Sequence, residues 1–423
     1  MSTPEVREQV AHVLRRVGFG PRPGSVESWE QEGAGALIEA LLDDERIEFR
    51  TEENLFDGLA MPGEDDGDYG FFVDVVSTML NGLAHGENPL HERMTWYWHT
   101  HLTSSYDRAS GSMIWRQHQL VRRHSLGHFP TLIRQITTDP AMLFYLDGAG
   151  SRGANPNENY ARELLELFTL GRNGGYGEDD VRAAARILSG WWVDWETEEV
   201  HFEPEETYSR PVTFMGERRR WDLDSFIDFV CNQPACAEHV ATRLYHHLVG
   251  PDLSDRRRRE LAAVFVDAGL EIRPLVAAIL RGPDFLEARR SRARQPVEWL
   301  IAARSVAGFH EVLGEYGEWW LDVLGQIPFV PPNVAGWPLD DRWSSASQVI
   351  SRTSVLFDWE LPDTVVDELE PTVDAVLARC GIHTPSPSTL QALKQIEADV
   401  SEYDGRLDLL LATALVSPEF TLL

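Results

Sequence analysis

A cluster of charged residues near the middle of the chain has the types and spacing that acid–base chemistry requires. The cluster follows the asparagine-rich sequence Asn155-Pro-Asn-Glu-Asn159 and comprises Glu158, Arg162, Glu163 and Glu166. If this segment is a helix, the charges occupy one arc and apolar side chains fill the opposite arc. Carboxylates beside an arginine can serve as general acid and base, or as oxygen ligands for a metal ion. We therefore take these four residues as candidate catalytic residues.

The same charges are also typical of a solvated helix face. Glu158 and Glu166 each lie four residues from Arg162, and such ion pairs stabilise a helix by only about 0.2 to 0.5 kcal/mol each. The asparagines favour a functional site over a solvated helix face, because Asn157 can cap the helix while its neighbours line a pocket. Asn157 and Asn159 are therefore candidate substrate-binding residues, and the ion-pair interpretation stays open beside them.

Two histidines are candidate ligands or proton carriers for this site. His124 is a candidate catalytic residue, and His101, His124 and Glu163 form a candidate ligand set for a divalent metal, the cofactor that this chemistry would suit. Each histidine also has a structural interpretation. His101 shares a face with apolar residues and can be a buried imidazole bonded to a carbonyl. His124 precedes an expected helix end, where a cation meets the helix dipole favourably.

Three further residues could complete a ligand-binding pocket. Arg186 and Trp191 lie at the end of the next expected helix, and Trp337 lies in the sequence Gly336-Trp-Pro338. Aromatic rings of this kind suit sugar rings or peptides, so all three are candidate substrate-binding residues. The alternative is that the tryptophans simply pack in the core.

Helical periodicity dominates the chain and predicts an all-α fold, a large array of helices. We expect an N-terminal helical lobe over residues 1–190 that carries the Asn157–Gly171 segment, an irregular excursion over 191–222 with one short hairpin, and a C-terminal helical lobe over 223–423. Prolines and tryptophans between Gln326 and Trp343 predict an ordered loop rather than a regular element.

Composition narrows the class of protein. The chain has 423 residues, a formal charge of −30 and three cysteines. So acidic a surface repels a polyanion, so we expect no nucleic-acid partner. No apolar run approaches the roughly 20 residues that cross a bilayer, and no export signal begins the chain. With too few cysteines for a disulfide framework, these features predict a cytoplasmic protein without a membrane partner.

Several short sequence motifs, spread along nearly the whole chain, together resemble those of one bacterial family, domain of unknown function 1800. They include His12-Val-Leu-Arg-Arg-Val-Gly-Phe-Gly20, Trp98-His-Thr-His101, Asp139-Pro-Ala-Met142, Tyr145-Leu-Asp147, Asn157-Glu-Asn-Tyr-Ala-Arg-Glu-Leu164 and Gly336-Trp-Pro338. The resemblance implies a mostly helical protein. It also implies a sulfatase-like partner protein and an extracellular substrate, because similar proteins are often exported and encoded beside such a partner.

Two functions follow from these residues. The first is a helical, metal- or carboxylate-dependent enzyme that hydrolyses a carbohydrate-related substrate. The second is a non-catalytic binding or assembly protein that acts with a partner. Nucleotide-driven and serine-hydrolase chemistry are not indicated, since the chain lacks a phosphate-binding GxxxxGK[ST] loop and a GxSxG elbow. An enzyme should place Glu163 beside a concave pocket, whereas a scaffold should pair its charges internally.

Overall fold

The computed structural model describes residues 4–43, 49–59, 67–314, 317–338, 341–400 and 403–423. Helices dominate these residues, and the strands form only two small two-stranded sheets, so the predicted all-α class is confirmed. Within the same ranges, no helix is both long and apolar enough to cross a membrane.

The first half of the chain is a succession of helices whose starts are set by local sequence. At α5, for example, Pro89 occupies the first turn and the Asn88 side chain accepts a hydrogen bond from the His91 amide at 3.1 Å. The helices before the excursion are α1 (Pro4–Val17), α2 (Ser25–Trp29), α3 (Gly33–Asp43), α4 (Gly67–His85), α5 (Pro89–His101), α6 (Gly111–His124), α7 (Phe129–Thr137), α8 (Pro140–Tyr145), α9 (Asn159–Glu163), the π-helix η1 (Leu164–Thr169) and α10 (Glu178–Ile187).

The second half is also helical, and proline again opens several of its helices. Its helices are α11 (Leu223–Cys231), α12 (Pro234–Leu248), α13 (Asp255–Asp267), α14 (Ile272–Leu280), α15 (Pro283–Glu287), α16 (Pro296–Val306), α17 (Gly317–Leu324), the 3-10 helix η3 (Asp341–Ser344), α18 (Ala346–Leu356), α19 (Asp363–Glu368), α20 (Val373–Arg379), α21 (Pro387–Asp399), α22 (Tyr403–Val416) and α23 (Pro418–Thr421).

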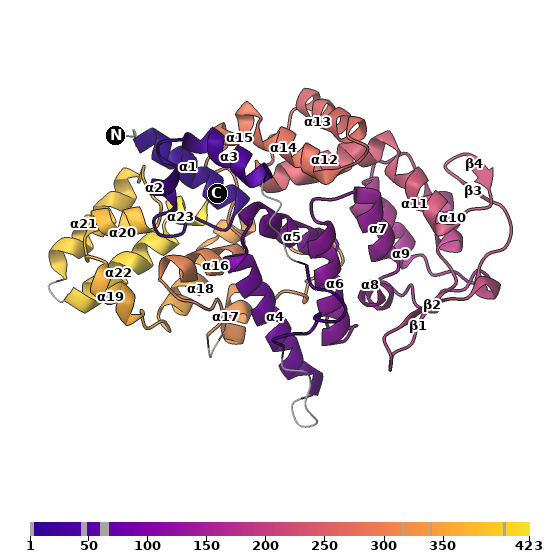
Figure 1. Ribbon diagram of the computed structural model, residues 1–423, viewed down its shortest axis with the longest axis horizontal. Helices are drawn as coiled ribbons and strands as arrows, with labels where there is room; N and C mark the ends of the chain where they lie inside the picture. The colour runs from indigo at the N-terminus through magenta and orange to yellow at the C-terminus, as the bar shows by residue number, and fades with distance from the viewer. Residues whose placement is uncertain (1–3, 44–48, 60–66, 315–316, 339–340, 401–402) are drawn as a thin grey trace.

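The buried apolar side chains form two large hydrophobic cores, and the helices that supply them form an elongated array (Figure 1). The first is built mainly by α1, α3, α7, η1 and α10 to α14, and the second by α4, α16, α17, α20 and α22. The central helix α5 belongs to both, because Trp96 packs in the second core while Tyr97 and Trp98 pack in the first. Each core takes residues from before and after the excursion, and the lobe boundaries drawn from the sequence stay a prediction.

The excursion contains two hairpins where one was expected. Strand β1 (Trp191–Val193) pairs with β2 (Val200–Phe202), and after the 3-10 helix η2 (Pro204–Glu206) strand β3 (Val212–Phe214) pairs with β4 (Glu217–Arg219). The second hairpin turns through Met215 and Gly216, whose φ values of 45° and 83° fit a two-residue type I′ turn. The Met215 amide donates to Asp180 Oδ1 at 2.7 Å, which fixes this hairpin to α10.

A buried group of ions joins the two halves of the chain. Glu298 of α16 is fully buried and forms ion pairs with Arg93 of α5 and with Arg292, whose Nη2 atom lies 3.0 Å from Glu298 Oε1. Burial opposes ionisation of Glu298, but the charges of Arg292 and Arg93 outweigh it and hold the pKa of this carboxyl well below its usual range. Removing any one of these three charges would leave a buried charge without its partner, so the group stabilises the fold only when all three are present.

The proline- and tryptophan-rich segment is an irregular, packed loop in its described part, which excludes residues 339–340. Gly336 has a φ of 73°, and a Cβ atom there would lie 2.4 Å from the carbonyl oxygen of Thr100. Only glycine lets the loop approach α5 this closely. The approach brings the next residue, Trp337, onto the ring of His99.

Candidate functional site

The asparagine-rich segment forms a short turn before α9. The Asn157 amide donates to Ser151 Oγ at 3.0 Å, and Asn157 Oδ1 accepts from the Asn159 amide at 2.8 Å. Glu158 occupies the N-cap position itself, and its side chain makes no capping hydrogen bond. Asn157, which the sequence suggests as the cap, thus lies one residue before the observed N-cap and shapes the turn instead.

The helix that carries the four candidate charges is not a regular α-helix. It changes at Leu164 into the π-helix η1, in which the Leu170 amide donates to the Leu165 carbonyl at 2.9 Å. Such π-helical turns are rare and are frequent at functional sites. Apolar spacing does not predict this change, because it fits a continuous α-helix equally well.

Two histidines form hydrogen bonds with the backbone of this π-helix. The Nε2 atom of His239, on α12, donates to the Leu167 carbonyl at 2.8 Å, and His101 hydrogen-bonds the backbone of Phe168. Burial, with the nearby charge of Arg243, holds the pKa of His101 well below its usual value. His101 is therefore a buried imidazole bonded to a carbonyl, the structural interpretation that its apolar surroundings suggested.

Most of the candidate charges are already paired at the surface. Arg162 donates to Glu178 Oε1 at 2.7 Å and to Glu158 Oε2 at 3.2 Å, and Arg172 donates to Glu166 Oε1 at 2.7 Å. The expected i,i+4 pair between Glu158 and Arg162 is thus present, whereas Glu166 pairs outside the helix. These partly exposed pairs contribute little to stability.

Glu163 differs from its neighbours, since it forms no hydrogen bond or ion pair with any described residue. It is half-buried, and burial together with the charge of Glu166 raises the pKa of its carboxyl. Burial and the negative charge of Glu163 also raise the pKa of Tyr145, to about 12. Glu163 and Tyr145 therefore lie close enough to interact.

The face of α9 that carries Glu163 points toward the end of α8. Asn159, one turn before Glu163 on the same face, donates to Asp147 Oδ2 at 2.8 Å, and Arg108 donates to Asp147 Oδ1 at 2.7 Å. Asp147 has a φ of 54°, an uncommon backbone conformation that aspartate tolerates better than most residues. We call Tyr145, Asp147, Asn159 and Glu163 the α8–α9 polar cluster.

A polar cavity of about 500 Å³ opens beside this cluster. We call it the loop cavity, and its lining comprises Asp147, Ala149, Gly150, Ser151, Asn155, Pro156, Asn157 and Glu158. Two of the residues expected in a pocket, Asn157 and Glu158, therefore do line one. Asp147 connects the cavity to Glu163 through Asn159.

A second cavity, of about 570 Å³, lies between α10 and the two hairpins. We call it the arginine–aromatic cavity, and its lining includes Arg186, Trp191, Phe202, Tyr208, Arg210, Arg220 and Trp221. Backbone hydrogen bonds join the walls of the two cavities, because Gly150 donates to the Trp191 carbonyl and Gly190 to the Ser151 carbonyl, both at 2.8 Å. Arg186 and Trp191 thus line a neighbouring cavity rather than the loop cavity, and their role in substrate binding stays a prediction.

Trp337 does not belong to either cavity. It is 5% exposed, packs with Trp343 and Ala293, and stacks on His99 with ring centroids 5.6 Å apart. The expectation that Trp337 binds substrate at this site is wrong, because the glycine before it draws the loop onto α5. Packing in the core, the alternative considered for the tryptophans, applies to Trp337.

The structure does not gather the three candidate metal ligands. His101 bonds the Phe168 backbone, His124 at the end of α6 bonds the side chain of Gln135 on α7, and Glu163 lies on α9 within electrostatic range of Tyr145. In the described ranges, no group of three or more histidine, cysteine, aspartate or glutamate residues has a metal-binding arrangement. The proposed ligand set is corrected accordingly, and His124 is left with its bond to Gln135.

Several residues of the two cavities were not singled out from the sequence. Asp147 and Ser151 lie in a loop with no periodic signal, and Arg210, Arg220 and Trp221 lie around a short hairpin. One signal was available: the sequence Arg218-Arg-Arg-Trp221 is a basic run in a chain of charge −30. Because the chain as a whole is strongly negative, this run predicts a local excess of positive charge.

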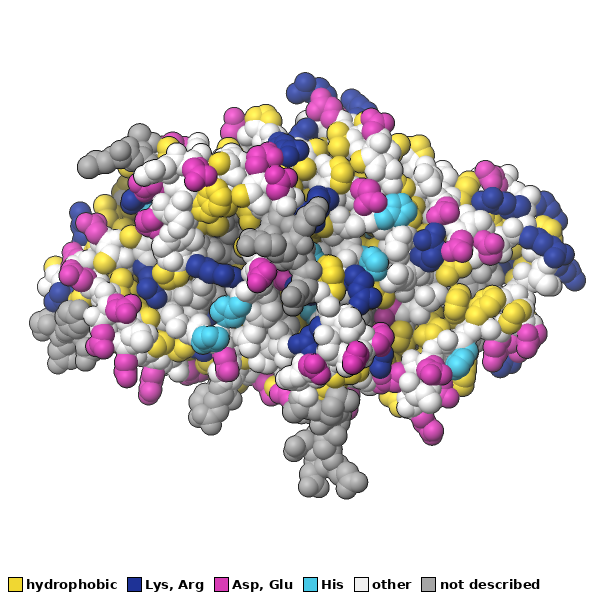
Figure 2. Space-filling view, in the orientation of Figure 1, with side chains coloured by type: hydrophobic (Ala, Val, Ile, Leu, Met, Phe, Trp, Pro, Cys, Tyr) yellow, Lys and Arg dark blue, Asp and Glu magenta, His cyan; other side chains and the backbone are white. Residues whose placement is uncertain are grey.

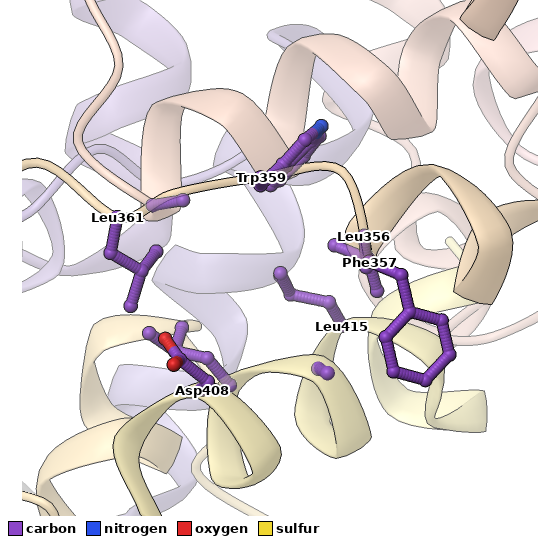
Figure 3. Close-up of a pocket in the computed structure, with 9 residues that line it drawn as sticks. Leu356, Phe357, Trp359, Leu361, Asp408 and Leu415 are labelled. Atoms are coloured by element: carbon purple, nitrogen blue, oxygen red, sulfur yellow. The ribbon is translucent and has the colours of Figure 1, made fainter. Parts of the chain in front are cut away.

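Other pockets lack comparable chemistry. One of about 160 Å³ lies where α18 and α22 meet, and Figure 3 shows Trp359, Leu361 and Leu415 around it, with Asp408 at one side and Phe357 turned away. Another, of about 320 Å³, lies between α4 and α17 and is mainly apolar. Neither combines several polar groups in the way that the loop cavity does.

Comparison with known proteins gives a family and no function. No curated protein and no solved structure matches the chain. The model of one family, described as "Protein of unknown function (DUF1800)", matches residues 12–422, which is nearly the full length. The match includes both cavities, the α8–α9 polar cluster and the buried ions around Glu298. The chain therefore belongs to the DUF1800 family.

Proposed function

We propose that this protein is a carboxylate-dependent hydrolase of a carbohydrate-related substrate, bound in the loop cavity. The observation that carries the proposal is the position of Glu163. It is a half-buried carboxyl with a raised pKa and no ion-pair partner among the described residues, on the same face of α9 as Asn159, which donates to Asp147 of the loop cavity. Glycoside hydrolysis requires two carboxyl groups, one of which stays protonated long enough to act as an acid.

The roles follow from the environments of the two carboxyl groups. Glu163 is the candidate general acid, since burial and the charge of Glu166 raise the pKa of its carboxyl. Asp147 accepts hydrogen bonds from Arg108 and Asn159 and is the candidate base or stabilising carboxylate. Ser151 and Asn157, in the cavity lining, would bind hydroxyl groups of the substrate.

The test is hydrolysis of a panel of neutral and acidic oligosaccharides, followed through the release of reducing ends. Glu163→Gln keeps the shape of the side chain and removes the acid, so we expect a loss of about 10² to 10⁴ in rate. Glu260→Gln, on the surface of α13, is the matched control and should keep the wild-type rate. Equal rates for wild type and Glu163→Gln, at unchanged thermal stability, would refute the role of Glu163.

A second candidate function, binding or assembly without catalysis, is favoured by the ion pairs of Arg162 with Glu158 and Glu178 and of Glu166 with Arg172. Three of the four candidate charges are satisfied there, as in a scaffold that docks a partner such as a sulfatase-like protein. Absence of hydrolysis of every substrate in the panel, with retained binding of one of them, would favour this second function.

A further inference from the structure

The arginine–aromatic cavity is positively charged in a strongly negative protein. Arg210 and Arg220, both exposed at its rim, form no ion pair or hydrogen bond with any described residue, although the chain carries a formal charge of −30. Arg186 also lacks a carboxylate partner in the described ranges and lies over the ring of Tyr208, 5.2 Å from its centroid. Figure 2 shows arginine side chains gathered at the end of the molecule where β3 and β4 lie.

The two aspartates in the lining leave these three arginines in excess, because one of the two is paired with an arginine outside the cavity. Asp222 caps α11 and accepts from the Ser225 amide at 2.8 Å. Asp224 forms an ion pair with Arg134 of α7 at 2.6 Å. The cavity thus keeps an excess of guanidinium groups whose donors are free to bind a ligand.

The aromatic rings of the cavity are fixed in place by their own contacts. Trp221 Nε1 donates to the Val212 carbonyl at 3.0 Å, and Arg219 lies over the Trp221 ring, 3.7 Å from its centroid. Trp191 packs against Phe202 with ring centroids 4.8 Å apart. Rings held in this way provide contact area at low entropic cost to a bound ligand.

We propose that this cavity binds an acidic oligosaccharide, with its carboxylate groups on Arg186, Arg210 and Arg220 and a sugar ring against Trp191 or Trp221. Guanidinium groups bind carboxylates through paired, charge-assisted hydrogen bonds. The cavity of about 570 Å³ is within the usual range for small ligands. The saccharide part of this inference rests on the proposed function, whereas the acidic part rests on the arginines.

Backbone hydrogen bonds join the walls of the two cavities, so we expect that one long ligand occupies both. Gly190 donates to the Ser151 carbonyl, so the two cavities are neighbours, and in this proposal one oligosaccharide extends from the loop cavity into the arginine–aromatic cavity. The acidic unit would therefore lie beside the unit that reacts. This arrangement makes the arginines a determinant of substrate choice.

The test measures binding separately from turnover. Tetragalacturonate and the neutral sugar maltotetraose are titrated into wild-type protein and into Glu163→Gln, with calorimetry and tryptophan fluorescence as readouts. We expect tetragalacturonate to bind at least about tenfold more tightly than maltotetraose, and the double variant Arg210→Gln, Arg220→Gln to lose at least about tenfold in affinity. Arg256→Gln with Arg259→Gln, on α13, is the matched control and should bind like wild type.

Equal affinity for the two sugars, or no binding of tetragalacturonate, would overturn the inference. So would tighter binding of a single-stranded oligonucleotide of similar charge, because that result would indicate a general polyanion surface. Selective binding that survives in Glu163→Gln supports the acidic site even if no hydrolysis is found. Trp221→Phe provides a second variant, in which fluorescence changes should shrink while the preference for the acidic sugar remains.

Discussion

The Nε2 atom of His239 lies 2.8 Å from the carbonyl oxygen of Leu167, so α12 holds the π-helix η1 from outside. A π-helix leaves carbonyl groups without the partners that an α-helix would give them, and here histidines from two other helices supply them. Since η1 follows directly after Glu163, these bonds also set the direction of the helix that carries the candidate acid.

His239→Ala should destabilise the fold by about 1 to 3 kcal/mol, because the Leu167 carbonyl would lose its partner. Urea unfolding would measure this change in free energy. His246→Ala, on the same helix and without a hydrogen bond among the described residues, serves as control and should cost less. An equal effect of both substitutions would argue against the carbonyl bond as the cause.

Gly336→Ala should destabilise the protein more than Gly175→Ala. Both glycines have positive φ, 73° and 83°, but a Cβ atom meets the Thr100 carbonyl at 2.4 Å only at Gly336 and open space at Gly175. The left-handed conformation alone costs roughly 1 to 2 kcal/mol for a residue other than glycine. Thermal unfolding of the two variants isolates the additional cost of the close approach, and equal melting temperatures would contradict it.

Glu298→Gln should cost about 3 to 5 kcal/mol, because Arg93 and Arg292 would be left as buried charges without their carboxylate. Denaturant unfolding at neutral pH measures the loss, and Glu260→Gln gives the baseline for an exposed glutamate. A change of less than about 1 kcal/mol would show that other groups neutralise these arginines.

Buried histidines should make the protein sensitive to acid. Burial lowers the pKa of both His12 and His99 from 6.5 to about 3, so below pH 6.5 the unfolded chain binds protons that the folded chain does not. Their contribution is complete above pH 6.5 and is lost as the pH falls toward 3. Unfolding free energies measured at pH 7 and at pH 5 should differ, and His99→Phe should reduce the difference while His201→Gln, exposed on β2, should not.

Alanine substitution of Trp337 should mainly lower the stability of the fold, whereas alanine substitution of Trp191 should mainly lower the affinity for ligand. Trp337→Ala removes a buried ring and should cost about 3 to 5 kcal/mol of stability. Trp191→Ala, at the cavity wall, should lower ligand affinity more than stability. Paired melting and binding measurements decide between these roles, and a stable Trp337→Ala protein with lost binding would reverse our assignment.

The helices and part of the site could be predicted because both depend on local spacing. Apolar periodicity identifies a helix face, and the asparagines around Glu158 are costly unless they shape a turn. Asn157 and Glu158 line the loop cavity, although their role in binding or catalysis stays a prediction. The ion pair of Glu158 with Arg162 follows from the same spacing.

The remaining features depend on contacts between distant segments. The π-helix is stabilised by His239, about 70 residues away, and Trp337 is buried because Gly336 meets α5. His101 and His124 both contain good ligand atoms, yet their partners, Phe168 and Gln135, are fixed by how the helices pack. Residue type alone does not separate a ligand from a packed side chain.

The membership of α5 in both hydrophobic cores has a consequence for how the molecule comes apart. Trp96 is anchored in one core and its neighbours Tyr97 and Trp98 in the other, so neither core can melt without withdrawing a ring from the same stretch of helix. The loop that carries Trp337 also packs against α5, through the stacking of Trp337 on His99. Heating should therefore produce one cooperative heat-absorption peak rather than two, as expected if the two cores unfold together.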